Sequence, residues 1–330
     1  MLATLAALVI AAPGGLQVKG NQLFYAGKPL TLRGVSVGDV PMARPNRTLD
    51  DYRVISRDWG ANCVRIGVAP NEWMKKDRKE MISILKKEVK AALDQKMFVL
   101  IDWHTIGWPD GFFQIPTWEG ADKDVYNSGF ALATDFWETC AKEFGKDGRV
   151  AFHLWCEPLM NAKDWETPRG SSWPKLRPWF VKLTESIRKK GANNLVIASG
   201  NQWAYDLAGI RENLLPDKNT AYEWHVYAGH GDNDPKKWAD KLDDLHKVAP
   251  VIVSEWGFQA DSTGHFKGTA DAFGKPFLEF MESRKMHWLA WCWHPTWGPN
   301  MLKEDWRTPT EFGQFVKDSL AKYRTTAIRP

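Results

Sequence analysis

Two glutamates stand at the ends of apolar runs in this sequence, in positions suited to acid–base chemistry. Glu157 ends the run that starts at Val150, and Glu255 lies near the end of the run Val251–Gly257. A carboxylate at the end of a buried strand costs free energy unless it is paired or used, so an ion pair is the alternative for either residue alone. Two carboxyl groups that face one cavity can have their pKa values pushed apart by separate surroundings. One then stays protonated and the other ionised, which is what hydrolysis of a glycosidic bond requires.

Other polar side chains end neighbouring apolar runs and can contact the two glutamates or the substrate. His225 and Tyr227 are two residues apart, so they point to the same face of a strand and into the same interior. Tyr227 is then placed to hydrogen-bond Glu255, and the positive charge of Arg65 can keep that carboxylate ionised. His104 and His225 are expected to contact sugar hydroxyls or to tune the acid.

These residues need a scaffold that gathers the ends of several strands. Runs of four to nine residues with β-branched and aromatic side chains predict eight strands. They are Leu30–Gly38, Cys63–Val68, Phe98–His104, Val150–Glu157, Leu195–Gly200, Thr220–Tyr227, Val251–Gly257 and Trp288–Trp293. Two shorter runs before them, Leu16–Lys19 and Gln22–Tyr25, predict a small hairpin.

Segments with apolar residues at helical spacing alternate with these strands. The segment Trp203–Leu214 is shorter and less regular than the others. The remaining predicted helices cover Thr48–Gly60, Asp77–Met97, Leu132–Phe144, Trp179–Lys190, Pro235–Val248, Ala270–Arg284 and Glu311–Tyr323.

Strands that alternate with helices predict an α/β fold, a (β/α)8 TIM barrel with a short N-terminal β-hairpin. Active sites of such barrels lie at the carboxyl ends of the strands, where the polar residues above fall. An open doubly wound sheet would need G-x-G-x-x-G after its first strand, and residues 33–38 lack that pattern. No linker or repeat divides the chain, so residues 16–330 are expected to form a single glycoside hydrolase catalytic domain, with residues 1–15 as a signal-like or N-terminal extension.

Composition points to a carbohydrate and away from other partners. The chain has 330 residues and contains 19 Trp, against 16 Phe and 7 Tyr. A core does not need so many indoles, because each buried indole N–H requires a hydrogen-bond acceptor. Flat indole faces, by contrast, stack well on sugars. The 44 Lys and Arg against 40 Asp and Glu leave a net charge of +4, too slight and too evenly spread for nucleic acid. The expected partner is a polysaccharide or oligosaccharide substrate, bound by a monomer.

The tryptophans divide into two predicted groups. Trp59, Trp137 and Trp155 lie on helix faces or lead a strand, and are expected to pack in the core. Others follow the strands and either stack on sugar or pack the loops, and the insert Asn161–Pro178 is expected to form a wall of the cleft. These loop positions are Trp108, Trp118, Trp165, Trp173, Trp203 and Trp297, with Phe112 and Phe113 beside them.

The N-terminus and the cysteines indicate the compartment and the absence of a cofactor. Residues 1–15 are apolar with Ala-rich ends, like a secretory signal without its basic start, which predicts a secreted or periplasmic protein. No later stretch reaches the roughly 18 apolar residues of a membrane span. The cysteines lack C-x-x-C spacing, and Cys63 and Cys292 are expected to be buried thiols. Residues 229–234 lack the closing Glu of a calcium loop, so neither a metal nor another cofactor is expected.

With these motifs in order, the chain resembles glycoside hydrolase family 5, a cellulase family in the large clan of retaining (β/α)8 hydrolases. The resemblance covers nearly the whole chain and is greatest to the bacterial endoglucanases of that family, through residues 291–295 and 302–306. The matching motifs are Val18–Gly34, Val64–Gly67, Asp102–His104, Glu157–Pro158, His225–Tyr227, Ser254–Gly257 and the strand of Trp291.

The resemblance implies a role for each residue of the carboxylate pair. By similarity, Glu157 is the acid/base and Glu255 is the nucleophile, and Arg65 and Tyr227 support Glu255. The two carboxyl groups are then expected to lie about 5–5.5 Å apart, as a retaining mechanism through a covalent intermediate requires.

The resemblance also implies the residues of the sugar subsite. By similarity, His104 and His225 line it, and Trp291 is the platform under the reacting sugar, with Trp293 as the competing choice. Indole faces stack best on equatorial-rich sugars such as glucose, which favours an endo-β-1,4-glucanase. A β-mannanase or an exo-β-glucosidase of the same family is the alternative.

One position departs from the family pattern. The residue before the acid/base is Asn in the family, where its amide binds the sugar 2-hydroxyl, and here it is Cys156. A thiol is a weak donor and acceptor, so it cannot match an amide, and the loss would cost about 2–4 kcal/mol of barrier. The enzyme is then slow or accepts an altered 2-position, or Asn201 replaces the amide. A non-catalytic carbohydrate-binding barrel and a catalytic thiol are the remaining alternatives.

Overall fold

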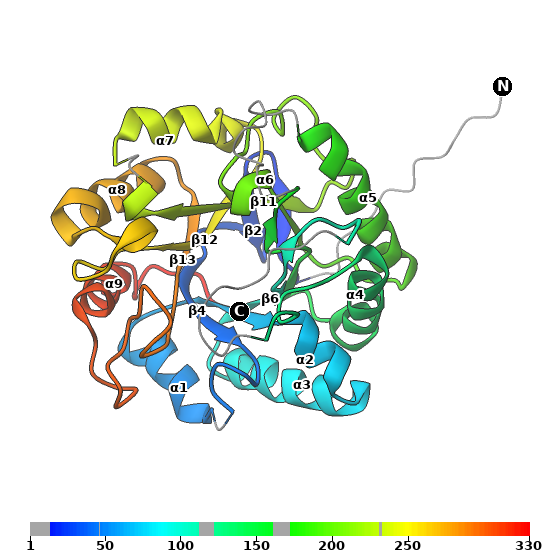
Figure 1. The fold of residues 1–330 in the computed structure, drawn as a ribbon, viewed down its shortest axis with the longest axis horizontal. Coiled ribbons are helices and arrows are strands. Elements are labelled where there is room, and N and C mark those ends of the chain that lie inside the picture. The colour runs from blue at the N-terminus through cyan, green and yellow to red at the C-terminus, as the bar shows by residue number, and fades with distance from the viewer. Residues whose placement is uncertain (1–13, 46, 112–121, 161–171, 231–232) are drawn as a thin grey trace.

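Eight parallel strands close into a barrel, which confirms the predicted fold (Figure 1). The computed structural model describes residues 14–330 except 46, 112–121, 161–171 and 231–232. Around the barrel, neighbouring strands follow chain order. They are β4 (Arg33–Asp39), β5 (Cys63–Val68), β6 (Phe98–Trp103), β8 (Val150–His153), β10 (Val196–Ser199), β11 (Thr220–Tyr227), β12 (Val251–Gly257) and β13 (His287–Ala290).

One predicted strand breaks where it matters for the site. The run Val150–Glu157 was expected as a single strand, but β8 ends at His153. Beyond it the backbone N–H groups of Cys156 and Glu157 donate to the carbonyls of Trp103 and Thr105. The chain therefore leaves the barrel ladder and forms a separate two-stranded ladder, β9 (Glu157–Pro158) with β7 (Ile106–Gly107).

The N-terminal end of the barrel is closed by a small antiparallel sheet. Three strands form it, instead of the predicted hairpin: β1 (Gln17–Lys19), β2 (Gln22–Tyr25) and β3 (Lys28–Leu30). The run Leu30–Gly38 is thus divided between β3 and β4. Buried Leu16, Leu23 and Leu30 pack against side chains from the starts of the barrel strands, including Phe98 and Leu100. We call this apolar cluster the floor of the barrel.

Helices surround the barrel, as Figure 1 shows. They are α1 (Leu49–Arg53), α2 (Pro70–Lys75), α3 (Arg78–Asp94), α4 (Phe130–Phe144), α5 (Trp173–Lys189), α6 (Asn201–Ala204), α7 (Pro235–Leu242), α8 (Lys275–Ser283) and α9 (Glu311–Ala321). Helix α5 begins at Trp173 rather than Trp179, because Pro174 suits the first turn of a helix. The predicted helix Trp203–Leu214 is wrong, since Gln202, Trp203 and Ala204 adopt left-handed backbone angles.

Most of the tryptophans pack between the barrel and its helices, so the expectation that a core would not need them is wrong. Several of their N–H groups find partners there: Trp137 donates to the Leu154 carbonyl at 3.0 Å, and Trp155 to the Gly107 carbonyl at 3.0 Å. This satisfies the polar edge of a buried indole. The fully buried indoles are Trp59, Trp73, Trp103, Trp137, Trp155, Trp224, Trp238, Trp256, Trp288 and Trp293.

Within the described part of the chain, no helix combines the length and the apolar character needed to cross a membrane. The signal-like residues fall almost wholly outside that part, since the description begins at residue 14.

Candidate active site

Glu255 points into the barrel mouth because strand β12 is irregular beside it. Trp224 pairs with Val253 and His225 pairs with Glu255, so Ser254 is skipped in the register between β11 and β12. Such a bulge re-aims a side chain. As a result Ser254 and Glu255, although adjacent, both contact inward-facing groups: Ser254 contacts Glu223, and Glu255 contacts Arg65.

Glu255 is held as a carboxylate by donors on both of its oxygens. The Arg65 guanidinium lies 2.7 Å from Oε1, and the Tyr227 hydroxyl donates to Oε2 at 2.5 Å. Burial alone would raise the pKa of Glu255, but the positive charges of His225, Arg65 and His104 and the bond from Tyr227 hold it below the ordinary value. Burial and the charge of Glu255 raise the pKa of Tyr227 well above its usual range, so the phenol keeps its proton and donates.

Glu157 has the opposite shift. Its Oε1 lies 3.0 Å from Nδ1 of His225, and that same nitrogen lies 3.8 Å from Oε2 of Glu255. Burial raises the pKa of Glu157, the hydrogen bond from His225 opposes that shift, and the negative charge of Glu255 adds to it, so the net shift is upward. The two carboxyl groups therefore share one imidazole while their pKa values are pushed apart, the arrangement of an acid beside a nucleophile.

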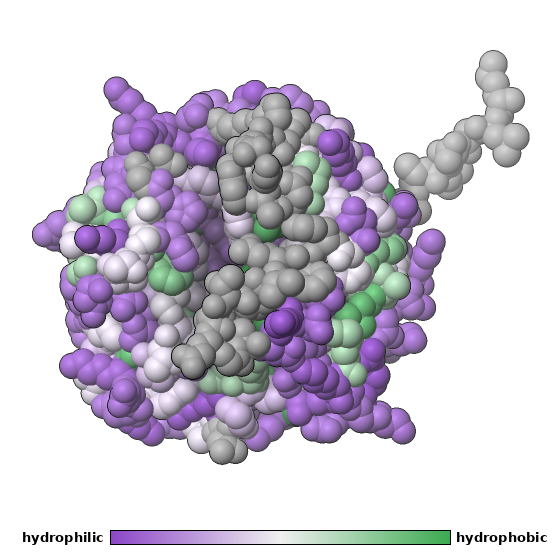
Figure 2. Space-filling view, in the orientation of Figure 1, coloured by the Kyte–Doolittle hydropathy of each residue, from purple (hydrophilic) through white to green (hydrophobic). Residues whose placement is uncertain are grey.

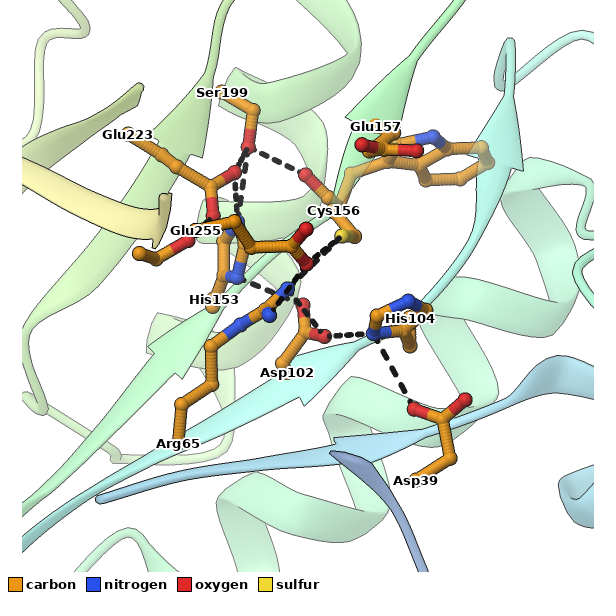
Figure 3. Close-up of polar contacts among 12 residues, drawn as sticks. Asp39, Arg65, Asp102, His104, His153, Cys156, Glu157, Ser199, Glu223 and Glu255 are labelled. Carbon is orange, nitrogen blue, oxygen red and sulfur yellow. Dashed lines mark hydrogen bonds and ion pairs between the residues drawn. The ribbon is translucent and has the colours of Figure 1, made fainter. Parts of the chain in front are cut away.

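Behind these carboxyls lies a chain of buried acids and histidines, in which His153 and Glu223 add to the residues that the sequence predicts (Figure 3). Asp102 contacts His104 at 2.9 Å, His153 at 2.7 Å and Arg65 at 2.8 Å. Glu223 lies 2.6 Å from the far nitrogen of His153 and 2.9 Å from Nε2 of His225. Carboxylates and imidazoles thus alternate across the barrel from Asp102 to Glu157. We call this set the mouth network.

Asp39 extends the mouth network at the end of β4. Its carboxylate lies 3.3 Å from Nδ1 of His104. The side chain fits because residue 67 is glycine: a Cβ there would lie 2.1 Å from Oδ1 of Asp39. Burial raises the pKa of Asp39 to about 6, although the positive charge of His104 opposes the shift.

The mouth network keeps its histidines protonated. Burial alone would lower the pKa of an imidazole, yet the neighbouring Asp39 and Asp102 raise that of His104 to about 9. Glu223 and Asp102 raise the pKa of His153, and Glu255 and Glu223 raise that of His225 well above its usual range. His225 therefore carries a positive charge between the two catalytic candidates.

Cys156 lies at the centre of this site. The break after β8 lets Cys156 and Glu157 both face the mouth, although alternation along one strand would separate them. The thiol sulfur lies 2.9 Å from Nη2 of Arg65 and 3.7 Å from Oε1 of Glu255. Burial raises the pKa of Cys156 well above the ordinary value, so the sulfur is a neutral thiol. Asn201, the suggested substitute for the missing amide, is buried and is not among the described residues that line the cavity.

A cavity of about 620 Å³ opens above the carboxylates. Figure 2 shows this face of the molecule as largely hydrophilic, with a hollow near its centre. Trp291 lines the cavity, in keeping with its expected place, but Trp293 does not: it is buried against Trp59, with ring centroids 4.5 Å apart. The described lining residues are His104, Ile106, Tyr126, Glu157, Trp203, Tyr205, His225, Tyr227, His230, Glu255, His265, Phe266 and Trp291.

The loop aromatics have mixed outcomes. Trp203 lines the cavity, and Trp297 stacks on Trp291 with ring centroids 6.1 Å apart. Trp108 and Trp173 are buried in the core instead. The segment 229–234, which lacks the calcium-loop pattern, contributes His230 to the cavity. Residues outside the described part of the chain are Phe112, Phe113, Trp118, Trp165 and most of the insert 161–178.

Comparison with known proteins identifies the family of this barrel. The profile of the cellulase family (glycosyl hydrolase family 5) matches residues 24–296. Endoglucanase N of Pectobacterium atrosepticum is 27% identical over 298 residues, which cover 87% of this chain and 59% of that protein. An endoglucanase of Clostridium saccharobutylicum is 27% identical over 286 residues, covering 84% of this chain and 57% of that protein. The chain thus spans somewhat more than half the length of these curated relatives.

Solved structures share the fold. The β-glucanase SdGluc5_26A of Saccharophagus degradans superposes with a TM-score of 0.84 at 23% identity, covering 94% of each chain. The same β-glucanase in complex with cellotetraose superposes with a TM-score of 0.83, again over 94% of each chain.

Proposed function

The chain belongs to the cellulase family, glycosyl hydrolase family 5, and on that premise we propose that it is a retaining endo-β-glucanase. The observation that carries the proposal is the carboxyl pair at the barrel mouth. Glu157 has a raised pKa and Glu255 a lowered one, and both contact the same nitrogen of His225. Opposite pKa shifts of this kind suit one carboxyl group to act as the acid and the other as the nucleophile.

In the proposed first step, protonated Glu157 donates its proton to the leaving oxygen while Glu255 attacks the anomeric carbon. Arg65 and Tyr227 hold the attacking carboxylate in place. Ester formation removes the negative charge of Glu255, which is one of the groups that raise the pKa of Glu157. Glu157 then ionises more readily and serves as the base that activates water in the second step.

Retention, rather than inversion, is supported by the closeness of the two carboxyl groups. An inverting pair stands about 6.5–9.5 Å apart, because a water must fit between acid and base. Here one imidazole nitrogen lies within 3.8 Å of oxygens from both residues. The expected carboxyl separation of about 5–5.5 Å stays a prediction.

The proposed substrate is a β-linked glucan. His104, His225 and Trp291 line the cavity and would contact the sugar in the reactive subsite, with the Trp291 indole as its platform. Cellotetraose, bound by the structurally similar β-glucanase, is a chain of this chemistry. A β-mannanase or an exo-β-glucosidase remains the alternative within the family.

The test is release of reducing sugar from soluble β-glucans and β-mannans. We expect glucan hydrolysis by the wild type and a loss on the order of 10⁴-fold in Glu255→Gln and in Glu157→Gln. Glu143→Gln is the matched control, since Glu143 pairs with Lys86 on the outer surface. The first product should be the β-anomer by NMR, and viscosity should fall before many reducing ends appear. An α-anomer would exclude retention, and activity left intact in both variants would exclude this carboxyl pair.

A non-catalytic carbohydrate-binding barrel is the second candidate, favoured by the thiol at Cys156. Binding of β-glucan with equal affinity by the wild type and Glu255→Gln, without turnover in either, would support it. For an enzyme limited by the missing amide, Cys156→Asn should raise the rate. No change or a loss would mean that this subsite is built for a different substituent at the 2-position.

We also propose export of the protein as a monomer. The apolar residues 1–15, with their Ala-rich ends, support a cleaved signal. Edman sequencing of protein recovered from the periplasm or medium should begin after this segment, and light scattering should give the mass of one chain.

A further inference from the structure

Three different donor atoms converge at the reacting centre: sulfur, nitrogen and oxygen. The thiol of Cys156, a ring nitrogen of His225 and a carboxylate oxygen of Glu255 all lie within 4.8 Å of one another. Thiolate, imidazole and carboxylate are the ligands that Zn²⁺ takes in proteins. We propose that these three side chains form a binding site for a thiophilic divalent cation such as Zn²⁺ or Cd²⁺, which blocks the active site.

The spacing of the donors fits a tetrahedral ion. Bonds of about 2.0–2.3 Å in a tetrahedron place neighbouring ligands roughly 3.3–3.8 Å apart. The sulfur of Cys156 lies 3.7 Å from Oε1 of Glu255, and Nδ1 of His225 lies 3.8 Å from Oε2. Each distance matches a tetrahedral edge, but the two end on different oxygens of Glu255, so the ion must take both oxygens or the carboxylate must turn.

The surroundings of His225 are those of a metal ligand. Its Nε2 lies 2.9 Å from Glu223, a carboxylate that fixes the ring and leaves Nδ1 toward the other donors. Glu157 lies 3.0 Å from that Nδ1 and is placed to become a fourth ligand. Glu157, His225 and Glu255 also line the open cavity, which gives the ion a path of entry.

Two protons and one cation oppose the ion. Cys156 and His225 are protonated in the free site, so binding must release a proton from each. Arg65 lies 2.9 Å from the sulfur and 2.7 Å from Oε1 of Glu255, so the cation must displace the guanidinium from the thiol. Arg65 keeps Asp102 as a partner at 2.8 Å when this happens. Because the ion would occupy Glu255 and His225, its binding would inhibit the enzyme, and Cys156 supplies the sulfur ligand.

Cobalt gives a direct measure of this site, because a thiolate bound to Co²⁺ produces an intense charge-transfer absorption in the near ultraviolet. Chelator-treated protein titrated with Co²⁺ should develop this band, and Zn²⁺ should displace the cobalt. Calorimetric affinity for Zn²⁺ should fall at least about 100-fold in Cys156→Ser and Cys156→Asn, and about 10-fold in Glu223→Gln. Mg²⁺, which prefers oxygen ligands, should not compete.

Cys140→Ala is the matched control, because Cys140 is a free, buried thiol on α4, away from the mouth. This variant should keep the cobalt band. Absence of the band in the wild type, or its survival in both Cys156 variants, would overturn the proposal. The readout is binding, so an inactive protein that binds cobalt through Cys156 would refute only the proposed hydrolysis, and an active protein without the band would refute only this inference.

Discussion

The floor and the mouth of the barrel are built from the same strands, yet they have opposite chemistry. On β6, Leu100 lies in the floor and Asp102 belongs to the mouth network; on β5, the corresponding pair is Cys63 and Arg65. All four side chains are fully buried. Two residues along a strand, roughly 7 Å, separate an apolar core from a set of paired charges.

Buried histidines make the same contrast measurable. His287, at the start of β13, accepts a hydrogen bond from the backbone N–H of Leu32, and burial, with a smaller contribution from Arg33, lowers its pKa to about 3. His104 is equally buried, but two carboxylates raise its pKa to about 9. Burial by itself removes the charge from an imidazole, and carboxylate partners restore it. The mouth is therefore charged because its groups are paired with one another.

The largest expected effect comes from breaking that pairing. Arg65→Met should lower the free energy of unfolding by about 3–5 kcal/mol, because it removes the guanidinium that contacts both buried carboxylates, Asp102 and Glu255. Denaturant titration at pH 7 measures this loss. Arg78→Met is the control: its partner Asp135 is solvent-exposed, so that variant should lose less than about 1 kcal/mol. Equal losses in the two variants would mean that the mouth charges do not depend on pairing.

The floor should respond to volume alone. Leu100→Ala should lower the free energy of unfolding by about 3 kcal/mol through the cavity that it leaves. The rate of glucan hydrolysis per folded molecule should stay unchanged, since Leu100 belongs to the floor cluster and is not among the described residues that line the cavity. A lower rate in the fully folded variant would show that floor and mouth are mechanically coupled.

Lowering the pH should also distinguish the neutral His287 from the protonated histidines of the mouth network. The folded pKa of His287 is about 3, below the unfolded value of 6.5, so its contribution to stability is complete above pH 6.5 and is lost as the pH falls toward 3. The slope is about 1.4 kcal/mol per pH unit at most. Denaturant titrations from pH 7 to pH 4.5 should show a shallower decline for His287→Asn than for the wild type. Parallel declines would contradict a neutral His287.

The sequence predicts most of the mouth because its key residues end apolar runs. Glu157, Glu255 and Arg65 follow from that pattern, and β5, β11 and β12 match their predicted bounds. Glu223 was missed although a signal existed: the two-residue spacing that places His225 and Tyr227 inside the barrel also places Glu223 there.

Other features of the mouth depend on tertiary structure. His153 joins the network at the last residue of β8, and that strand ends there because the chain turns to pair with the segment after β6. The skipped register at Ser254 likewise has no mark in the sequence. Trp291 and Trp293 are indistinguishable as a motif, and only the path of the chain after β13 assigns one to the cavity and the other to the core.

The smallest expected effect tests whether Glu223 acts on the chemistry or only on the fold. Glu223→Gln keeps the volume but removes the negative charge between His153 and His225, so the pKa of each imidazole should fall. Less positive charge then faces Glu157 and Glu255, and we expect about a 10-fold lower kcat with a shifted pH profile. Imidazole NMR titration should show lower midpoints for His153 and His225. The midpoint of His287, at the start of β13, should not change. A uniform loss of activity at every pH, with unmoved midpoints, would assign Glu223 a purely structural role and remove the mouth network from the mechanism.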